Sequence, residues 1–422
     1  MIDTFKQRAA ALDAADPLAA FRDEFHIPQH EHRDSTYLCG NSLGVQPKAT
    51  RQALIDELDD WAQLGVEGHF RGRHPWMPYH ELLRDGLAHV AGAEPGEVVA
   101  MNSLTANLHL MMVSFYRPTR ERPAILIEQG AFPSDRYAVE SQIRFHGFDP
   151  AQCLIEVAPD TDTGTISMAA IARAIECHRE RLALVLWPGV QSRSGAKRMI
   201  WRTSCASAMQ RAPSSDSTWR MASATCRCIC TTANADFAVW CSYKYLNSGT
   251  GAVAGCFVHE RHARTDRPRF AGWWGHDQST RFRMGPDFMP TPGAEGWQLS
   301  NPPILALAPL RVSLEIFERA DILQLREKSK AMTAFYAESI DTVLGQHLAI
   351  LTPRDPERRG CQLSLRVRAG RERGRGLFEH LEQHGVIGDW REPDVIRVSP
   401  TPLYNRYGDI VPLLREASSF LA

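Results

Sequence analysis

One lysine in this chain stands where covalent chemistry could occur. Lys244 follows the apolar run Phe237–Trp240, which is typical of a buried strand, and Gly249 and Gly251 come soon after it. A lysine at the end of a buried strand loses hydration, which lowers the pKa of its amine and favours the neutral nucleophile. Such an amine can hold an aldehyde cofactor as a Schiff base. By position alone a solvent-exposed lysine is the better interpretation, so the rest of the chain must decide.

Two strand-to-helix junctions suit a phosphorylated ligand. In Met101–Asn107, Thr105 could cap a helix whose free backbone amides would bind a phosphate. In Gly130–Asp135, which follows the next strand, Phe132 could stack on a flat ring. An ordinary capped helix and an ordinary turn explain the same residues. Two later loops, Phe270–His276 and Ser300–Pro303, are rich in donors and aromatic rings and could carry function or serve as docking surface.

The elements that would position these residues form a mainly parallel α/β domain. Short apolar strands alternate with helical segments from about residue 96 to residue 258, which predicts a buried parallel sheet with ligands at the carboxyl ends of its strands. The expected strands are Val98–Met101, Ala124–Ile127, Leu154–Val157, Leu182–Trp187, Phe237–Trp240 and one near Val253, and the expected helices are 47–65, 106–116, 136–145 and 168–181.

The character of the sequence changes after Pro303. A helical tract over 304–343 leads to strands at Leu363–Val367 and Val395–Val398, with a helix near Leu377. We therefore expect three parts: residues 1–65 as an N-terminal segment packing with a small domain, 66–303 as a large cofactor-binding domain, and 304–422 as a smaller α+β domain.

Composition excludes several classes of protein. The 422 residues include 44% hydrophobic and 23% charged types, with a net charge of -1, which is ordinary for a soluble globular protein and argues against nucleic acid or an anionic membrane as the main partner. No apolar run is long enough to span a bilayer, and the N-terminus has no signal-peptide pattern. Most of the ten cysteines are scattered, as in reduced intracellular proteins. We expect a cytoplasmic protein.

Taken together, these segments resemble kynureninase, a family of pyridoxal-phosphate enzymes of the type I aminotransferase fold. The resemblance covers most of the chain, and the order and spacing of its motifs make it specific. The matching motifs are Tyr37–Gly44, Ser103–Thr105, Phe132–Asp135, Trp187–Gln191, Trp240–Gly249, Gly272–His276, Leu299–Pro303 and Arg397–Tyr404.

The resemblance implies a role for each matching residue. Lys244 is similar to the Schiff-base lysine and proton shuttle, and Tyr243 to the neighbouring tyrosine near the phosphate. Arg397 resembles the clamp for the substrate α-carboxylate, a bidentate task suited to a guanidinium. The implied cofactor contacts are Leu104, Thr105, Phe132, Pro133, Ser134, Asp135, Trp273 and Asn301, and the implied pocket for the aromatic ring is His69, Ser300 and Asn301.

The resemblance also implies a reaction and an assembly. L-kynurenine, or 3-hydroxykynurenine, would be cleaved by water between Cβ and Cγ to anthranilate, or 3-hydroxyanthranilate, and L-alanine. Trp273 and Asn301 would reach the cofactor across the interface of a homodimer. Another enzyme of the same fold, a cysteine desulfurase or an aminotransferase, is the alternative, although desulfurases place a histidine before the lysine where this chain has Tyr243. The second alternative is an inactive remnant of such an enzyme.

The stretch 196–232 departs from the family. Kynureninases carry the carboxylate that holds the pyridine nitrogen in a strand ending Gly-Phe-Asp-Leu-Ala-His, and this chain has no such strand before Lys244. Ser214–Met221 can, however, be encoded by DNA that reads Val-Val-Gly-Phe-Asp-Leu-Ala-His when shifted by one base. We infer a local reading-frame shift. In the shifted frame, the codon of the missing aspartate overlaps those of Ser217 and Thr218, and the codon of the missing histidine overlaps those of Arg220 and Met221.

The shift has two consequences. Cys226-Arg-Cys-Ile-Cys230 does not have a standard zinc spacing and lacks an accompanying histidine, so we expect no metal there and interpret the cysteines as a product of the shifted frame. If the chain is made as written, polar residues replace a core strand. Each buried polar group without a partner costs about 1–3 kcal/mol against a total stability of about 5–15 kcal/mol.

Overall fold

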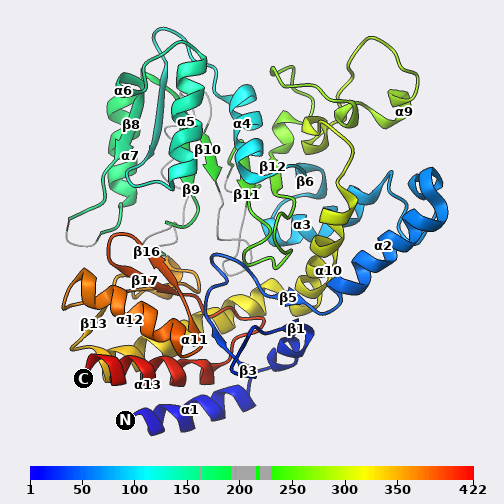
Figure 1. Ribbon diagram of the computed structural model, residues 1–422. Helices are drawn as coiled ribbons and strands as arrows, with labels where there is room; N and C mark the ends of the chain where they lie inside the picture. The colour runs from blue at the N-terminus through cyan, green and yellow to red at the C-terminus, as the bar shows by residue number, and fades with distance from the viewer. Residues whose placement is uncertain (162–163, 192–194, 196–214, 219–229, 233) are drawn as a thin grey trace.

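The computed structural model describes residues 1–161, 164–191, 195, 215–218, 230–232 and 234–422 (Figure 1). A seven-stranded sheet has the order β6-β12-β11-β10-β9-β7-β8. Of its strands, only β12 is antiparallel to its neighbours, so the prediction of a mainly parallel sheet is confirmed. The strands are β6 (Val98–Ala100), β7 (Ala124–Glu128), β8 (Leu154–Val157), β9 (Leu182–Pro188), β10 (Ser215–Thr218), β11 (Phe237–Trp240) and β12 (Gly255–Val258).

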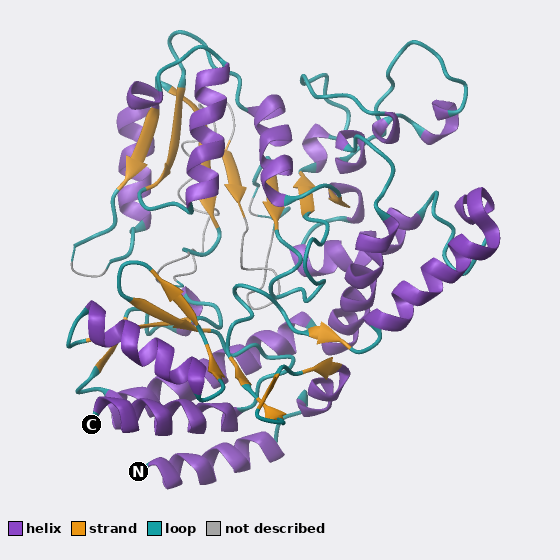
Figure 2. Ribbon diagram, viewed as in Figure 1, coloured by secondary structure: helices purple, strands orange, loops and turns teal. Residues whose placement is uncertain are grey.

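Helices cover both faces of this sheet, because its strands are apolar on both sides (Figure 2). Phe237 and Val239 pack with α4 and α5, whereas Ala238 and Trp240 pack with α3 and α10 on the opposite face. Successive side chains of a strand point to opposite faces, which gives this division. The helices of this part are α3 (Arg84–Ala91), α4 (Leu104–Phe115), α5 (Pro133–Phe145), α6 (Pro150–Cys153), α7 (Met168–His178) and α9 (Gln278–Arg281).

A four-stranded sheet, β13-β14-β17-β16, lies below the large one in Figure 1. The helical tract after Pro303 is two helices, because Asp321 takes a positive φ of 54° and caps the second one through its side chain. The elements are α10 (Ile304–Ala320), α11 (Ile322–Leu344), β13 (Leu348–Ile350), β14 (Leu363–Val367), α12 (Arg371–Gln383), β16 (Asp389–Arg391), β17 (Val395–Val398) and α13 (Ile410–Leu421).

The N-terminal residues touch both parts. Helix α1 (Ile2–Ala14) packs against α13, near the C-terminus in Figure 1. Helix α2 (Thr50–Leu64) packs against α10 and ends at Gly65, as predicted. Short strands join the segments: β1 (Phe25–His26) with β5 (Gln46–Pro47), β2 (Gln29–His30) with β3 (Arg33–Asp34), and β4 (Thr36–Tyr37) with β15 (Val386–Ile387).

Several predicted boundaries shift by a few residues. The strand expected near Val253 begins at Gly255, and α4 begins at Leu104 rather than at residue 106. The three-part division of the chain stays a prediction, since one hydrophobic cluster runs from β6 and β11 through α3 into α10. None of the helices among the described residues is long and apolar enough to cross a membrane.

Candidate active site

The turn after β11 holds Lys244 half-buried. The Lys244 Nζ lies 6.0 Å from the centroid of the Tyr243 ring. The backbone N–H of Asn247 donates to the Lys244 carbonyl at 2.9 Å, and Asn247 takes a positive φ of 52°. The Ser242 hydroxyl donates to the carbonyl of Val253. These bonds give the lysine a defined backbone position at the carboxyl edge of the sheet.

Strand β11 is locked in register at both ends. Trp240 pairs with Gly255 of β12, and a Cβ on Gly255 would lie 2.1 Å from the Trp240 ring, so only glycine fits there. At the other end, Asp236 Oδ1 accepts from Arg261 Nη2 at 2.6 Å and lies 2.6 Å from His262 Nε2. A charged pair and a close-packed indole therefore determine where the strand ends and the Lys244 turn begins.

The two predicted phosphate-binding junctions meet. Thr105 Oγ1 lies 3.0 Å from Ser134 Oγ, although the residues are 29 positions apart. Both stand in the first turn of a helix: Ser103 is the N-cap of α4 and Phe132 that of α5, and neither makes a capping hydrogen bond through its side chain. The expectation that Thr105 caps α4 is therefore wrong, because it lies inside the helix. Two hydroxyls beside two helix N-termini without side-chain caps suit an anionic oxygen group.

The segment Tyr37–Gly44 connects the lysine to the small sheet. Gly44 N–H donates to the Tyr243 carbonyl at 2.9 Å, and Ser399 N–H, just after β17, donates to the Leu38 carbonyl at 2.8 Å. A Cβ on Gly44 would lie 2.2 Å from the Lys244 carbonyl oxygen. Glycine is therefore required where this segment crosses the Lys244 turn, and the crossing links Lys244 to the strand that carries Arg397.

Arg397 is buried and ion-paired. Only 2% of its side chain is exposed, and its guanidinium pairs with Asp389 of β16. The Asn41 amide, oriented so that its nitrogen donates to the Ser399 hydroxyl at 3.1 Å, accepts from Arg397 Nε and Nη2 at 3.3 and 3.2 Å. Burial lowers the pKa of Arg397, but an arginine starts high enough to stay charged at neutral pH. The site thus holds a fixed, desolvated cation.

Phe132 lies where the two sheets approach each other. The Arg391 guanidinium, at the end of β16, is 5.7 Å from the centroid of the Phe132 ring at the start of α5. Arg391 Nη2 also lies 3.6 Å from Asp389, and its buried Nε makes no hydrogen bond. Burial lowers the pKa of Arg391. The small sheet therefore brings a second cation next to the ring that we predicted to contact the cofactor.

The remaining predicted residues lie on a more exposed surface. His69, in the 3₁₀ turn Gly65–His69 after α2, packs its ring 5.4 Å from the Trp76 ring. Trp273 is 43% exposed, and its loop lies against the 299–301 segment, where Trp274 N–H donates to the Leu299 carbonyl at 3.1 Å. Ser300 and Asn301 are exposed. The structure thus places these four residues outside the buried part that holds Lys244.

Two cavities lie beside the first turn of α10. One, of about 540 Å³, is lined by Tyr37, Gly44 and the 247–250 segment that follows Lys244. The other, of about 450 Å³, is lined by Trp61, Trp76 and Pro303. The first turn of α10, through Leu305 and Ala306, lines both. The first turn of α10 therefore borders one cavity beside the segment after Lys244 and a second cavity beside Trp76, whose ring packs with His69.

Sequence reasoning missed four residues of this site. Asn41, Gly44, Asp389 and Arg391 contact predicted residues, yet only Asn41 and Gly44 stood inside a motif that we had singled out. The sequence signal for Asp389 and Arg391 was that an acid and an arginine stand a few residues before Arg397. The positions of the expected histidine, Arg220 and Met221, and most of 196–232 lie outside the described residues. The backbone of Ser215–Thr218 does form β10, between β9 and β11.

Comparison with solved structures defines the class of protein. The chain superposes on the cysteine desulfurase CsdA of Escherichia coli with a TM-score of 0.75 at 14% identity, covering 96% of this chain and 98% of that one. An alanine–glyoxylate aminotransferase of Nostoc sp. matches with a TM-score of 0.67 at 15% identity, over 95% and 98% of the two chains. The fold is the type I fold of these enzymes, as predicted.

Sequence comparison defines the family. The chain is 60% identical to kynureninase of Xanthomonas oryzae pv. oryzae, over 99% of this chain and 98% of that one. It is 58% identical to kynureninase of Xanthomonas campestris pv. campestris over the same shares. The kynureninase C-terminal domain family matches residues 325–416. The chain belongs to the kynureninase family.

Proposed function

We propose that this chain is a pyridoxal-phosphate hydrolase that splits the Cβ–Cγ bond of L-kynurenine, and of 3-hydroxykynurenine. Membership of the kynureninase family supports this activity. The observation that carries the assignment of residues is the convergence of Lys244, the Thr105–Ser134 pair and the Arg397 strand, which the segment Tyr37–Gly44 connects.

The residues of the described part fit the cofactor. The hydroxyls of Thr105 and Ser134, with the first amides of α4 and α5, would hold the phosphate, which is the charge that helix N-termini prefer. Phe132 would stack on the ring and Asp135 would contact it, while Leu104 and Pro133 shape the same two junctions. Tyr243 would lie beside the phosphate, and Lys244 would supply the amine that forms the covalent link.

The protein residues act on protons and orientation. Pyridoxal phosphate, when bound, accepts the electron pair released at the substrate α-carbon. Lys244 Nζ would take the proton from that carbon, and the Tyr243 hydroxyl would donate one. Water adds its oxygen to the γ-carbonyl carbon, the Cβ–Cγ bond breaks, and the β-carbon takes up a proton. The products, anthranilate and L-alanine, together contain the atoms of kynurenine and one water.

Arg397 would bind the substrate α-carboxylate. Its guanidinium is buried and already held by Asp389 and Asn41, so little conformational entropy is lost when a carboxylate arrives. His69, Ser300 and Asn301 would enclose the aromatic ring. Trp273 and Asn301 would contact the cofactor of the opposite subunit.

The exposed apolar surface supports a homodimer. Trp61 of α2 is 61% exposed, and Phe70, shortly after this helix, is 62% exposed. The buried residues of α2 are Thr50, Ala53 and Glu57 instead. Large apolar side chains gathered around a cavity favour a protein partner, and a second copy would bring its own Trp273 and Asn301. We also propose a cytoplasmic location, which the free thiols of the described cysteines support.

We propose that the sequence written over 196–232 impairs this activity and that restoring the reading frame recovers it. Strand β10 runs through the centre of the sheet beside β11, where Ser217 pairs with Trp187 and Ala238, and Thr218 with Pro188 and Val239. An aspartate at the end of this strand would stand at the carboxyl edge that also carries Lys244. The written sequence has no carboxylate at Ser217 or Thr218. This position supports the reading-frame hypothesis, and resequencing the coding DNA over 196–232 tests it.

The function is tested by comparing the chain as written with a version whose frame is restored over 196–232. We expect the restored protein to release anthranilate and alanine from L-kynurenine, and borohydride reduction to leave its label on Lys244. The written chain should show turnover lower by about 10³-fold or more, since it lacks the group that keeps the pyridine protonated. A label on another residue, or release of alanine from cysteine by the restored protein without kynurenine turnover, would overturn the assignment.

A further inference from the structure

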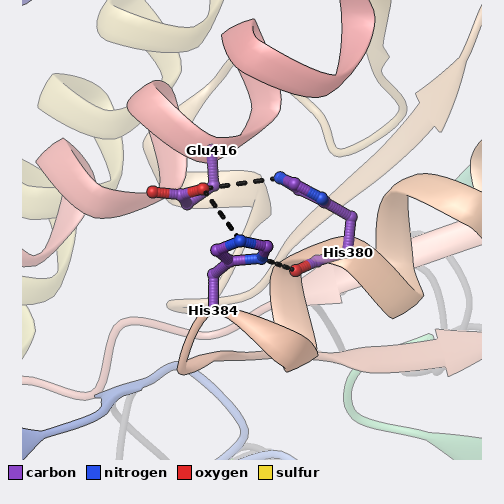
Figure 3. A group of neighbouring side chains, drawn as sticks. All are labelled: His380, His384 and Glu416. Atoms are coloured by element: carbon purple, nitrogen blue, oxygen red, sulfur yellow. Dashed lines mark hydrogen bonds and ion pairs between the residues drawn. The ribbon is translucent and has the colours of Figure 1, made fainter.

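Three side chains of the small domain, none of them assigned to the candidate active site, converge on one point (Figure 3). His380 lies on α12, His384 follows that helix as its C-cap, and Glu416 lies on α13. His380 Nε2 is 3.4 Å from Glu416 Oε2, and His384 Nε2 is 4.0 Å from the same oxygen. One ligand atom from each residue lies within 4.8 Å of the other two. In the described part of the chain, no other group of histidine, cysteine or acidic side chains converges in this way.

The hydrogen bonding of His384 identifies its free nitrogen. Its Nδ1 lies 2.7 Å from the backbone carbonyl of His380, and a carbonyl oxygen only accepts, so Nδ1 carries the hydrogen. In the neutral ring, Nε2 then presents its lone pair toward Glu416. Metal-ligating histidines characteristically donate their other N–H to a carbonyl or carboxylate, which orients the ring.

His380 and Glu416 leave a second lone pair and a carboxylate facing this point. His380 Nε2 is buried and makes no hydrogen bond, and its ring lies 4.1 Å from the His384 ring, centroid to centroid, at 35°. Two positively charged imidazoles so close together would repel each other. When both imidazoles are neutral, they and the carboxylate place three electron-pair donors around a common space, and this arrangement suits a cation.

We propose that His380, His384 and Glu416 bind a divalent transition-metal ion of the zinc type. Two imidazoles and one carboxylate are a common zinc donor set, and water would complete a tetrahedral site. Bonds of about 2.0–2.1 Å put tetrahedral ligands about 3.3 Å apart. The His380–Glu416 distance is already 3.4 Å, and the His384–Glu416 distance of 4.0 Å is about 0.7 Å longer than such a site requires. From the sequence we predicted no metal site in this chain, so the proposed triad revises that prediction.

The ion would join α12 to the C-terminal helix α13. Neither helix carries a residue that we assign to the reaction, so we expect the metal to stabilise the small domain and to leave the chemistry unchanged. Ligand binding to the folded state raises the melting temperature in proportion to the logarithm of the ligand concentration above Kd. The proposal does not depend on the proposed reaction.

The experiment uses the full chain, both as written and with its frame restored, after removal of metal by chelator. Zinc chloride is titrated in by calorimetry, and bound zinc is counted after dialysis. We expect about one zinc per chain and a rise in melting temperature of about 2 °C or more. His384→Gln and His380→Ala should weaken binding at least tenfold, and Glu416→Gln should weaken it less, because a neutral amide oxygen can still coordinate.

Matched controls separate this site from other ligands. His347→Ala removes an exposed histidine of the same domain and should leave zinc binding unchanged. Cobalt(II) titration distinguishes thiolate from imidazole ligands by its charge-transfer absorption, which would reveal binding at cysteines instead. Equal zinc affinity in the parent and His384→Gln proteins, or a cobalt spectrum typical of thiolates, would overturn the proposal. So would the absence of any zinc-dependent rise in melting temperature.

Discussion

The two sides of the candidate site differ in how they are built. Around Lys244, the turn after β11, the segment Tyr37–Gly44 and the Arg397 strand are joined by backbone hydrogen bonds and by a buried ion pair. Trp273, by contrast, is 43% exposed, and His69 is only partly buried next to the Trp76 ring. One chain thus encloses the reactive amine, whereas the proposed aromatic-ring pocket stays open.

The difference shows which interactions a single chain can complete. The lysine and arginine need desolvation and accurate backbone placement, and strands of the large and small sheets, linked through the segment Tyr37–Gly44, provide both. The pocket for a flat ring needs large apolar walls, which a monomer cannot leave exposed without a partner to cover them. Variants around Lys244 should therefore lower catalytic activity, whereas variants on the exposed apolar surface should weaken the dimer.

The largest effect is expected at Lys244. In the frame-restored protein, Lys244→Ala should lower kcat/KM for kynurenine by about 10³-fold or more, because it removes both the covalent link and the proton carrier. Anthranilate release measures it, with the melting temperature as a check on folding. If the variant keeps a tenth of the activity, the amine is not the reacting group.

The next effect is on assembly. Trp61→Glu places a charge in the exposed apolar face of α2, and a central tryptophan contributes about 2–4 kcal/mol to an interface, so the dimer Kd should rise by about 30-fold to 1000-fold. Light scattering over a concentration series measures it, and activity should fall in parallel upon dilution. Phe145→Glu, on the 75% exposed Phe145 of α5, is the matched control. A dimer unaffected by Trp61→Glu would remove α2 from the interface.

A smaller effect is expected for Arg397→Lys. A lysine keeps the charge but loses the bidentate geometry, which is worth about 1.5–3 kcal/mol for a hydrogen bond to a charged group, so KM should rise by about tenfold to 100-fold. Asp389→Asn keeps the shape of the neighbour while removing its charge and should raise KM less. Steady-state kinetics measure both variants. A change in kcat alone would contradict the assignment of Arg397 to the substrate carboxylate.

Gly44→Ala should have the smallest effect, confined to stability and positioning. Its Cβ would collide with the Lys244 carbonyl, and overpacking of this kind costs about 1–3 kcal/mol. Chemical denaturation measures the free energy of unfolding. Gly96→Ala, where a Cβ meets open space, is the control and should change stability by about 0.5 kcal/mol or less. Equal stability of the two variants would show that the segment Tyr37–Gly44 can shift away from the Lys244 turn without loss of stability.

Periodicity predicted much of the large sheet, because its strands are short runs of apolar residues that cannot be exposed on either face. Leu154–Val157 and Phe237–Trp240 were predicted to the residue. Boundaries set by single backbone conformations were missed: the positive φ of Asp321 breaks a tract with continuous helical pattern, and Ser103 rather than Thr105 begins α4. Such choices depend on local hydrogen bonds that periodicity does not report.

By itself the sequence determined the family, and it predicted a reactive lysine and the motifs around it, since these depend on residue type and order along the chain. Only the tertiary structure decided that Thr105 meets Ser134, that Gly44 crosses the Lys244 turn, and that Asp389 and Asn41 hold Arg397. The same is true of the His380–His384–Glu416 triad, whose glutamate comes from a different helix. Contacts between distant segments depend on how strands and helices pack in space, and a pattern along the chain does not specify the distances between those segments.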